Sequence, residues 1–195
     1  EDLSARRFYA DQRLFPSQGV GAFVYDKRGT GDSAGVFTHD YRRLATDAVA
    51  ALDEARRLAG GRAGRIGFYG TSQGGWVAPL AATQTRVDFV LVGYGLAISP
   101  LDEDTEAVEL DMKRHGFGAA ETVKALEVAR AAQAIVLSNF RDGFSELRAK
   151  RDQYANEPWF KFVRGNVTHL MLGMPEETVR AQGPVLFNGI LPRYD

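Results

Sequence analysis

The 195-residue sequence contains no cysteine, which excludes disulfides, thiolate metal sites and a cysteine nucleophile. It also lacks an excess of either charge, because 24 basic residues stand against 25 acidic ones, for a formal net charge of −1. This balance favours neither nucleic acid nor a charged membrane surface as a partner. The apolar runs fall short of the roughly 18 residues that span a bilayer. With 45% hydrophobic residues the sequence fits a globular protein, and its compartment stays open.

The first half of the sequence alternates between predicted helices and short apolar runs. We expect helices over 3–18, 41–59 and 73–83, and strands over 19–25, 65–70 and 87–92. Short, nearly continuous apolar runs are typical of strands buried on both faces of a parallel sheet. Thr38 or Asp40 can cap the second helix, and Gly60 and Gly61 end it. Elements that alternate at this spacing predict a parallel sheet with right-handed crossovers.

The second half of the sequence is helical in pattern. Three amphipathic helices are predicted over 102–114, 119–137 and 143–155, with breaks at Gly116 and Gly143. A helical block of roughly 80 residues is too long for a simple crossover. The fold class we expect is α/β, an incomplete doubly wound parallel sheet with a mostly helical cap insertion. Its parts are residues 1–99 in the core, 100–182 in the cap, and 183–195 returning toward the core.

One serine stands at a turn between a predicted strand and a predicted helix. Gly70-Thr71-Ser72-Gln73-Gly74 matches G-x-S-x-G, in which a tight turn strains the nucleophile's backbone and exposes its hydroxyl above the sheet. Side chains two residues before and after the serine would collide, so we expect glycine to be needed at both places. Gly75 would let the helix start close to the strand. The backbone N–H of Gln73 would point at a developing oxyanion, which makes Ser72 the predicted nucleophile.

Two other motifs in the glycine-rich loop over 26–35 compete with this interpretation. Gly31-Asp32-Ser33-Ala34-Gly35 also matches G-x-S-x-G, but no strand directly precedes Ser33 and no helix directly follows it. Gly29-Thr30-Gly31-Asp32-Ser33-Ala34 fits the dinucleotide pattern G-x-G-x-x-G/A, with Asp53 about twenty residues later. Those glycines should open a helix at the end of a strand, and here the helix starts too late. We therefore expect neither a nucleotide cofactor nor a metal.

The two segments together resemble the α/β-hydrolase superfamily. Residues 25–33 (YDKRGTGDS) look like its signature Y-D-x-R-G-x-G-x-S, and residues 66–75 look like its nucleophile elbow. The likeness covers about residues 20–95 and is similar, more narrowly, to bacterial esterases and acyl-peptidase-like hydrolases with a helical cap. It implies a serine hydrolase without a cofactor, in which Asp26, Arg28 and Asp32 hold the loop in shape. We expect Trp76, next to the turn, to pack in the core.

A serine nucleophile needs a histidine that accepts its proton and an acid that orients the histidine. In this superfamily both follow the serine in the chain, each after a further strand. The three histidines are His39, which precedes the serine, His115, in a helix C-terminal signature, and His169, in the helical block. We expect each to be a surface or packed histidine rather than the base.

The C-terminal residues allow two interpretations. Residues 184–187 can be the next strand, with Asp195 as the triad acid, or 191–195 can be the approach to that strand. We prefer the second, because Gly189 and Pro192 interrupt a regular strand. No histidine follows in either case, and the second oxyanion donor should come from upstream of Glu1. We therefore expect an internal fragment that on its own turns over no ester measurably.

The leading hypothesis is a serine hydrolase that acts on a small-molecule acyl substrate, namely an ester, thioester or small amide, through a Ser72 acyl-enzyme. The Gln73 N–H would form half of the oxyanion hole. Acyl transfer or peptidase action by the same serine is an alternative, because the residues that choose the acceptor are not identifiable. A non-catalytic binding protein of the same fold is the alternative from another class. The intact G-x-S-x-G turn argues against it, since its glycines would be costly to keep for packing alone.

Overall fold

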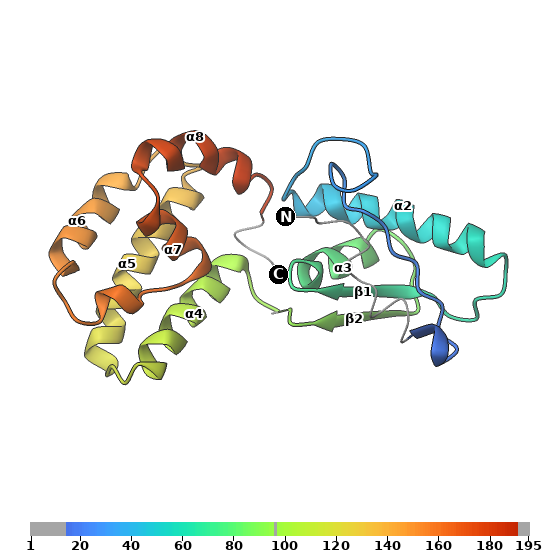
Figure 1. The fold of residues 1–195 in the computed structure, drawn as a ribbon, viewed down its shortest axis with the longest axis horizontal. Helices are drawn as coiled ribbons and strands as arrows, with labels where there is room; N and C mark the ends of the chain where they lie inside the picture. Colours follow the sequence, from blue (N-terminus) through green and yellow to red (C-terminus); the bar gives the residue numbers. More distant parts are fainter. Residues whose placement is uncertain (1–14, 96, 191–195) are drawn as a thin grey trace. The chain divides into compact units, whose positions relative to one another are not determined.

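The computed structural model describes residues 15–95 and 97–190 of the chain. The chain forms two compact units, Glu1–Leu96 and Ala97–Asp195. The first, called the α/β unit below, contains helices and strands, and the second, the helical unit, contains helices throughout its described residues (Figure 1). The mixed α/β character expected from the sequence is therefore present in the first unit.

The α/β unit is built on a pair of parallel strands. Its elements, in order, are α2 (Tyr41–Ala59), β1 (Gly67–Thr71), α3 (Gly74–Ala82) and β2 (Phe89–Gly93). Gly67 lies opposite Phe89 and Thr71 lies opposite Gly93 in the parallel register. α3 connects the strands and packs against both, while α2 packs against α3 (Figure 1). These four elements confirm the sequence prediction, and the described residues contain no larger, doubly wound sheet.

α2 begins and ends where the sequence predicts. The carboxylate of Asp40 caps it by accepting a hydrogen bond from the backbone N–H of Arg43 at 3.0 Å. Gly60 ends it in the left-handed conformation, and its N–H donates to the carbonyl oxygens of Arg56 and Arg57. Its buried face consists of Tyr41, Leu44, Ala45, Ala48 and Leu52.

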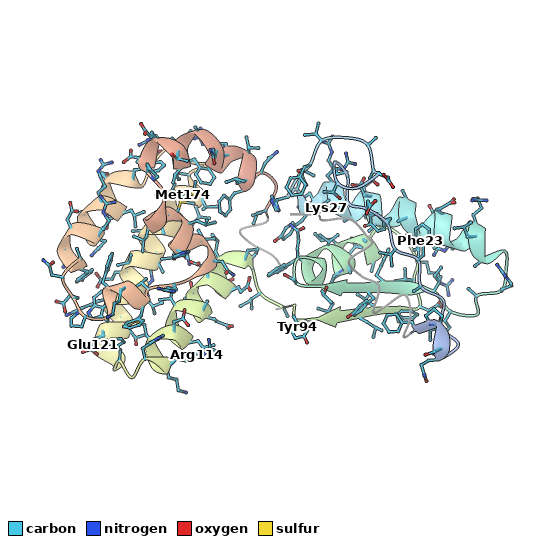
Figure 2. All side chains as sticks on the ribbon, viewed as in Figure 1. Phe23, Lys27, Tyr94, Arg114, Glu121 and Met174 are labelled. Atoms are coloured by element: carbon cyan, nitrogen blue, oxygen red, sulfur yellow. The ribbon has the colours of Figure 1, made fainter. Side chains whose placement is uncertain are left out.

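The predicted strand over 19–25 is wrong. Residues 21–25 form no backbone hydrogen bond with another described residue, and the described ladder joins β1 and β2 alone. Phe23 and Tyr25 are both exposed, and Figure 2 shows Phe23 on this segment. An apolar run becomes a strand only beside a hydrogen-bonding neighbour, and the described sheet offers this run none. Of the predicted first helix, residues 15–17 are helical and the rest lies outside the described residues.

The strands are also less buried than their apolar sequences predict. Tyr69, Leu91 and Val92 are all exposed. Side chains alternate between the two faces of a strand, and among the described helices α3 makes the main contact with the pair. The expectation of strands buried on both faces is therefore wrong for the described part of the chain.

The helical unit follows the predicted pattern and extends it. Its elements are α4 (Pro100–Arg114), α5 (Ala119–Leu137), α6 (Phe144–Tyr154), a short 3-10 helix (Phe160–Phe162), α7 (Asn166–Gly173) and α8 (Glu176–Leu186). The three predicted helices are confirmed as α4, α5 and α6. The interpretation of 184–187 as a strand is wrong, because these residues lie at the C-terminal end of α8. Residues 191–195 lie outside the described residues, and the division at 99/100 and 182/183 stays a prediction.

A buried carboxylate organises the core of the helical unit. Asp104, on α4, is fully buried. It accepts hydrogen bonds from the backbone N–H groups of Val167 and Thr168 at 2.7 and 3.0 Å, from the Thr168 hydroxyl at 2.7 Å and from the Gln133 amide at 3.0 Å. Asp104 thereby satisfies two N–H groups at the start of α7 and joins α4, α5 and α7. No helix among the described residues is both long and apolar enough to cross a membrane.

Candidate functional site

Ser72 occupies a strained position between β1 and α3. Its φ is +52°, in the left-handed region, which costs a residue other than glycine on the order of 1–3 kcal/mol. Its N–H donates to the carbonyl oxygen of Gly93 at 3.1 Å, and its own carbonyl oxygen accepts from the N–H of Gly75 at 2.7 Å. The end of the strand ladder and the first turn of α3 therefore hold the residue, and its side chain is exposed.

The glycines around Ser72 contribute unequally to the turn. A Cβ atom at Gly70 would lie 2.2 Å from the carbonyl oxygen of Gly74, and one at Gly75 would lie 2.6 Å from the Cα of Gly95. Both positions therefore require glycine, as the sequence predicts. A Cβ atom at Gly74 would meet no atom of another described residue within 4 Å, so for the described part of the chain the expectation that residue 74 must be glycine is wrong. The collision involves the backbone of residue 74 rather than any side chain there.

The backbone N–H of Gln73 lies at the start of α3. Gln73 precedes the first residue of the helix, and its carbonyl oxygen accepts from the N–H groups of Trp76 and Val77, both at 3.2 Å. Among the described residues no backbone carbonyl accepts a hydrogen bond from the Gln73 N–H. A free N–H at the positive end of a helix is suited to bind a negatively charged oxygen.

The side chain of Gln73 lies between two residues of the preceding loop. The Nζ of Lys27 donates to the Oε1 of Gln73 at 2.8 Å, and the Nε2 of Gln73 lies 3.1 Å from the Nδ1 of His39. Lys27 also lies over the ring of Phe37, at 4.6 Å from its centroid, and Phe37 contacts His39 edge to face at 5.0 Å. Burial, and then the charge of Lys27, lower the pKa of His39, and burial lowers the pKa of Lys27.

Sequence reasoning missed this cluster. The sequence predicts His39 as a loop residue that precedes the helix cap. Lys27 occupies a variable position of the signature Y-D-x-R-G-x-G-x-S. Neither pattern contains a signal that the two residues approach Gln73, which lies 46 and 34 positions away. Figure 2 shows Lys27 on the loop that precedes α2.

The loop that carries Lys27 is held in shape by its charged residues. Arg28 forms a two-pronged ion pair with Asp47 of α2. The N–H of Asp32 donates to the carboxylate of Asp26 at 3.0 Å, and the hydroxyl of Ser33 donates to the carbonyl oxygen of Asp26 at 2.7 Å. The structure thus agrees with the structural role that the resemblance implies for Asp26, Arg28 and Asp32.

Both competing motifs of this loop lack the required context. No helix begins between Ser33 and α2, and the Ser33 hydroxyl is engaged within the loop. Gly29 and Gly31 form turns rather than the start of a helix. Asp53 pairs with Arg56 on the exposed surface of α2 at 3.0 Å. The geometry therefore favours neither Ser33 as a nucleophile nor a dinucleotide site.

The structure also describes Trp76 and the two other histidines that the sequence analysis considered. Trp76 is buried and stacks on Tyr41 with ring centroids 5.8 Å apart, which confirms its packing role. In the helical unit His115 ends α4 and stacks on Phe162 at 3.9 Å, and His169 is exposed on α7. Within the described ranges no three His, Asp or Glu side chains gather as a metal-binding group.

Comparison with known proteins adds one match. Residues 1–109 match the X-Pro dipeptidyl-peptidase (S15) family. No curated protein and no solved structure matches the chain. The family match covers more than half of the chain, and it includes the charged loop, the Ser72 turn and the start of α4. It supports the resemblance to hydrolases, without supporting esterases in particular. The chain therefore belongs to the X-Pro dipeptidyl-peptidase (S15) family, a serine peptidase family of the α/β-hydrolase type.

Proposed function

We propose that this chain carries the nucleophile of a serine hydrolase and that Ser72 is this nucleophile. The observation that carries the proposal is the left-handed backbone of Ser72 between β1 and α3. Strained residues other than glycine persist only where their surroundings hold them, and they cluster at active sites. The family match supports the same chemistry independently.

The proposed reaction passes through a covalent intermediate. The Ser72 oxygen attacks the carbonyl carbon of the substrate, a base takes the hydroxyl proton, and the leaving group departs to give an acyl-enzyme that water then cleaves. The Gln73 N–H, free of other backbone partners among the described residues, would stabilise the oxyanion that forms. Esters, thioesters and small amides are the substrate classes, and the name of the family adds the peptide bond that follows an X-Pro dipeptide.

Hydrolysis by variants of Ser72 tests this proposal. The protein at its natural length is assayed with p-nitrophenyl acyl esters and with a fluorogenic amide of an X-Pro dipeptide. Ser72→Ala should lower turnover by roughly 10³-fold or more, because the nucleophile is lost. Ser145→Ala, which removes an exposed hydroxyl from the helical unit, is the matched control and should retain wild-type turnover.

The outcome also separates the proposal from its alternatives. Turnover that survives in Ser72→Ala would contradict the assignment of the nucleophile. A folded natural-length protein that hydrolyses neither substrate class would instead favour a non-catalytic binding protein. The expectation that residues 1–195 alone turn over no ester is checked in the same assay, and Ser72-dependent hydrolysis by that polypeptide would contradict it.

A further inference from the structure

The hydrogen bonds around Gln73 have a defined direction. A lysine ammonium can only donate, so the atom of Gln73 that faces Lys27 is the carbonyl Oε1. The amide Nε2 therefore faces His39 and donates to its Nδ1. An imidazole that accepts at Nδ1 is neutral and carries its proton on Nε2. The three side chains form one ordered chain of donors and acceptors, from Lys27 through Gln73 to His39.

This chain connects the Ser72 turn to a firmly anchored loop. Arg28, next to Lys27, donates hydrogen bonds from its guanidinium Nε and Nη2 to the carboxylate of Asp47 on α2. The hydroxyl of Thr30 donates to the carbonyl oxygen of Lys27 at 2.6 Å. The position of Lys27 is therefore fixed by contacts that do not involve the turn. A rigid anchor is what a side chain needs to hold another residue in place.

Gln73 shares a peptide bond with the strained Ser72. The carbonyl oxygen of the Ser72–Gln73 peptide accepts from the N–H of Gly75 at 2.7 Å, and the N–H of Ser72, which belongs to the preceding peptide, donates to the carbonyl oxygen of Gly93 at 3.1 Å. Gln73 directly precedes α3, and its side chain makes no helix cap. The contacts with Lys27 and His39 are the side-chain contacts that fix Gln73 within the described residues. They add a side-chain anchor to the backbone hydrogen bonds of the turn.

We propose that Lys27 and His39 are positioning residues that act through Gln73 to keep Ser72 left-handed and the Gln73 N–H in place. This inference rests on the proposed function, because it assigns those two groups to the reaction. Lys27 and His39 contact Gln73 rather than the reacting atoms. Their role is to keep the turn from relaxing out of a conformation that costs free energy.

The arrangement requires a neutral imidazole. Among the described residues, the groups that face His39 are the ammonium of Lys27, the ring of Phe37 and the Gln73 amide. The start of α2 follows directly at Tyr41, with the Asp40 carboxylate engaged at its cap. Protonation of Nδ1 would set an N–H against the N–H of the Gln73 amide and break the chain of hydrogen bonds. The positioning effect should therefore weaken at acidic pH.

The test measures the backbone of Ser72 directly, without relying on activity. In the isotope-labelled 195-residue chain, the three-bond HN–Hα coupling and the strong intraresidue HN–Hα NOE report the positive φ of Ser72. Lys27→Met removes the donor and keeps the length of the side chain, and His39→Leu removes the acceptor. Lys27→Arg restores a donor and serves as the rescue. Lys113→Met, which removes an exposed lysine from α4, is the matched control.

We expect Lys27→Met and His39→Leu to lose the left-handed signature of Ser72, and Lys27→Arg and Lys113→Met to retain it. In the natural-length protein the first two variants should also label Ser72 with a fluorophosphonate about 10-fold more slowly, as a small misplacement of reacting groups predicts. A Ser72 signature unchanged in both variants, with α2 and β2 intact in the spectra, would overturn the inference. Its failure is distinct from that of the proposed function, which would appear as an unlabelled wild-type Ser72.

Discussion

Both units contain left-handed residues other than glycine, and one from each unit, Phe140 and Ser72, shows that such residues are held in different ways. Phe140 of the helical unit has φ +61°, and its buried ring packs against Phe187 with centroids 5.6 Å apart. Ser72 of the α/β unit has φ +52° and an exposed side chain. Packing therefore stabilises the first residue, whereas hydrogen bonds from the strand ladder and the helix hold the second. Strain held by polar contacts leaves the side chain free to meet a substrate.

The two units that contain these residues also differ in how much of their apolar surface is buried. Among the described residues of the helical unit, nineteen buried apolar residues form the core cluster. In the α/β unit the buried apolar residues lie on α2 and α3, while β2 is largely exposed. We infer that single changes in the helical unit mainly alter its stability, whereas single changes in the α/β unit alter the geometry at Ser72.

The largest effect is expected from Asp104→Ala. This change leaves the buried N–H groups of Val167 and Thr168 and the Thr168 hydroxyl without their acceptor, so the free energy of unfolding of the helical unit should fall by about 3–5 kcal/mol. Amide hydrogen exchange followed by mass spectrometry measures the two units separately. Asp152→Ala, at an exposed position of α6, is the control. A loss below about 1 kcal/mol would contradict the organising role of Asp104.

Alanine substitutions at Gly70 and Gly74 should have very different effects on stability. Gly70→Ala places a Cβ atom 2.2 Å from the Gly74 carbonyl oxygen and should destabilise the α/β unit by about 2–3 kcal/mol. Gly74→Ala places its Cβ atom where no described residue lies within 4 Å and should change stability by less than about 0.5 kcal/mol. Denaturant unfolding of both variants measures the pair. Equal effects at the two positions would show that the geometry of the turn is wrong.

Relief of the strain at Ser72 should stabilise the protein slightly while removing its proposed chemistry. Glycine adopts positive φ without a steric penalty, so Ser72→Gly should be about 1 kcal/mol more stable than Ser72→Ala. Both variants lack the hydroxyl, which makes alanine the matched reference. The measurement is the difference in their free energies of unfolding by urea. If Ser72→Ala proves the more stable, Ser72 is not strained in solution.

The smallest effect concerns the pH dependence of stability. Burial and Lys27 lower the pKa of folded His39 below the ordinary 6.5 that holds in the unfolded chain. The unfolded chain therefore binds the proton more readily, and stability present above pH 6.5 is lost as the pH falls toward the folded pKa. His39→Asn should remove this part of the pH dependence. Unfolding free energies between pH 7.5 and about 5 measure it, and identical pH slopes in the two proteins would refute the assignment.

Local patterns predicted most of the fold. The cap at Asp40, the stop at Gly60 and the run of helices after Pro100 all depend on residues near them in sequence, and the structure has each of them. The same reasoning failed for residues 19–25, because a strand depends on a neighbour that the local pattern does not contain. It failed for Gly74 because the motif predicts a collision between side chains at residues 70 and 74. In the structure a side chain at residue 70 would instead collide with the backbone carbonyl oxygen of residue 74.

The candidate site could be predicted only in part. The strand–serine–helix context identified the turn at Ser72, and its backbone has the strain expected of such a turn. The contacts of Lys27 and His39 with Gln73 join segments more than thirty residues apart, and no sequence spacing encodes them. These long-range polar contacts form when α2 and α3 pack together. Local sequence patterns do not show how the two helices pack.

Covalent labelling tests the assignment of Ser72 most directly. The natural-length protein is treated with a fluorophosphonate probe, which reacts with a serine that a base and an oxyanion hole activate, and the modified residue is mapped by mass spectrometry. We predict modification at Ser72 in the wild-type protein and its loss in Ser72→Ala. Modification at Ser33 or another serine, or no modification of the folded protein, would contradict the account.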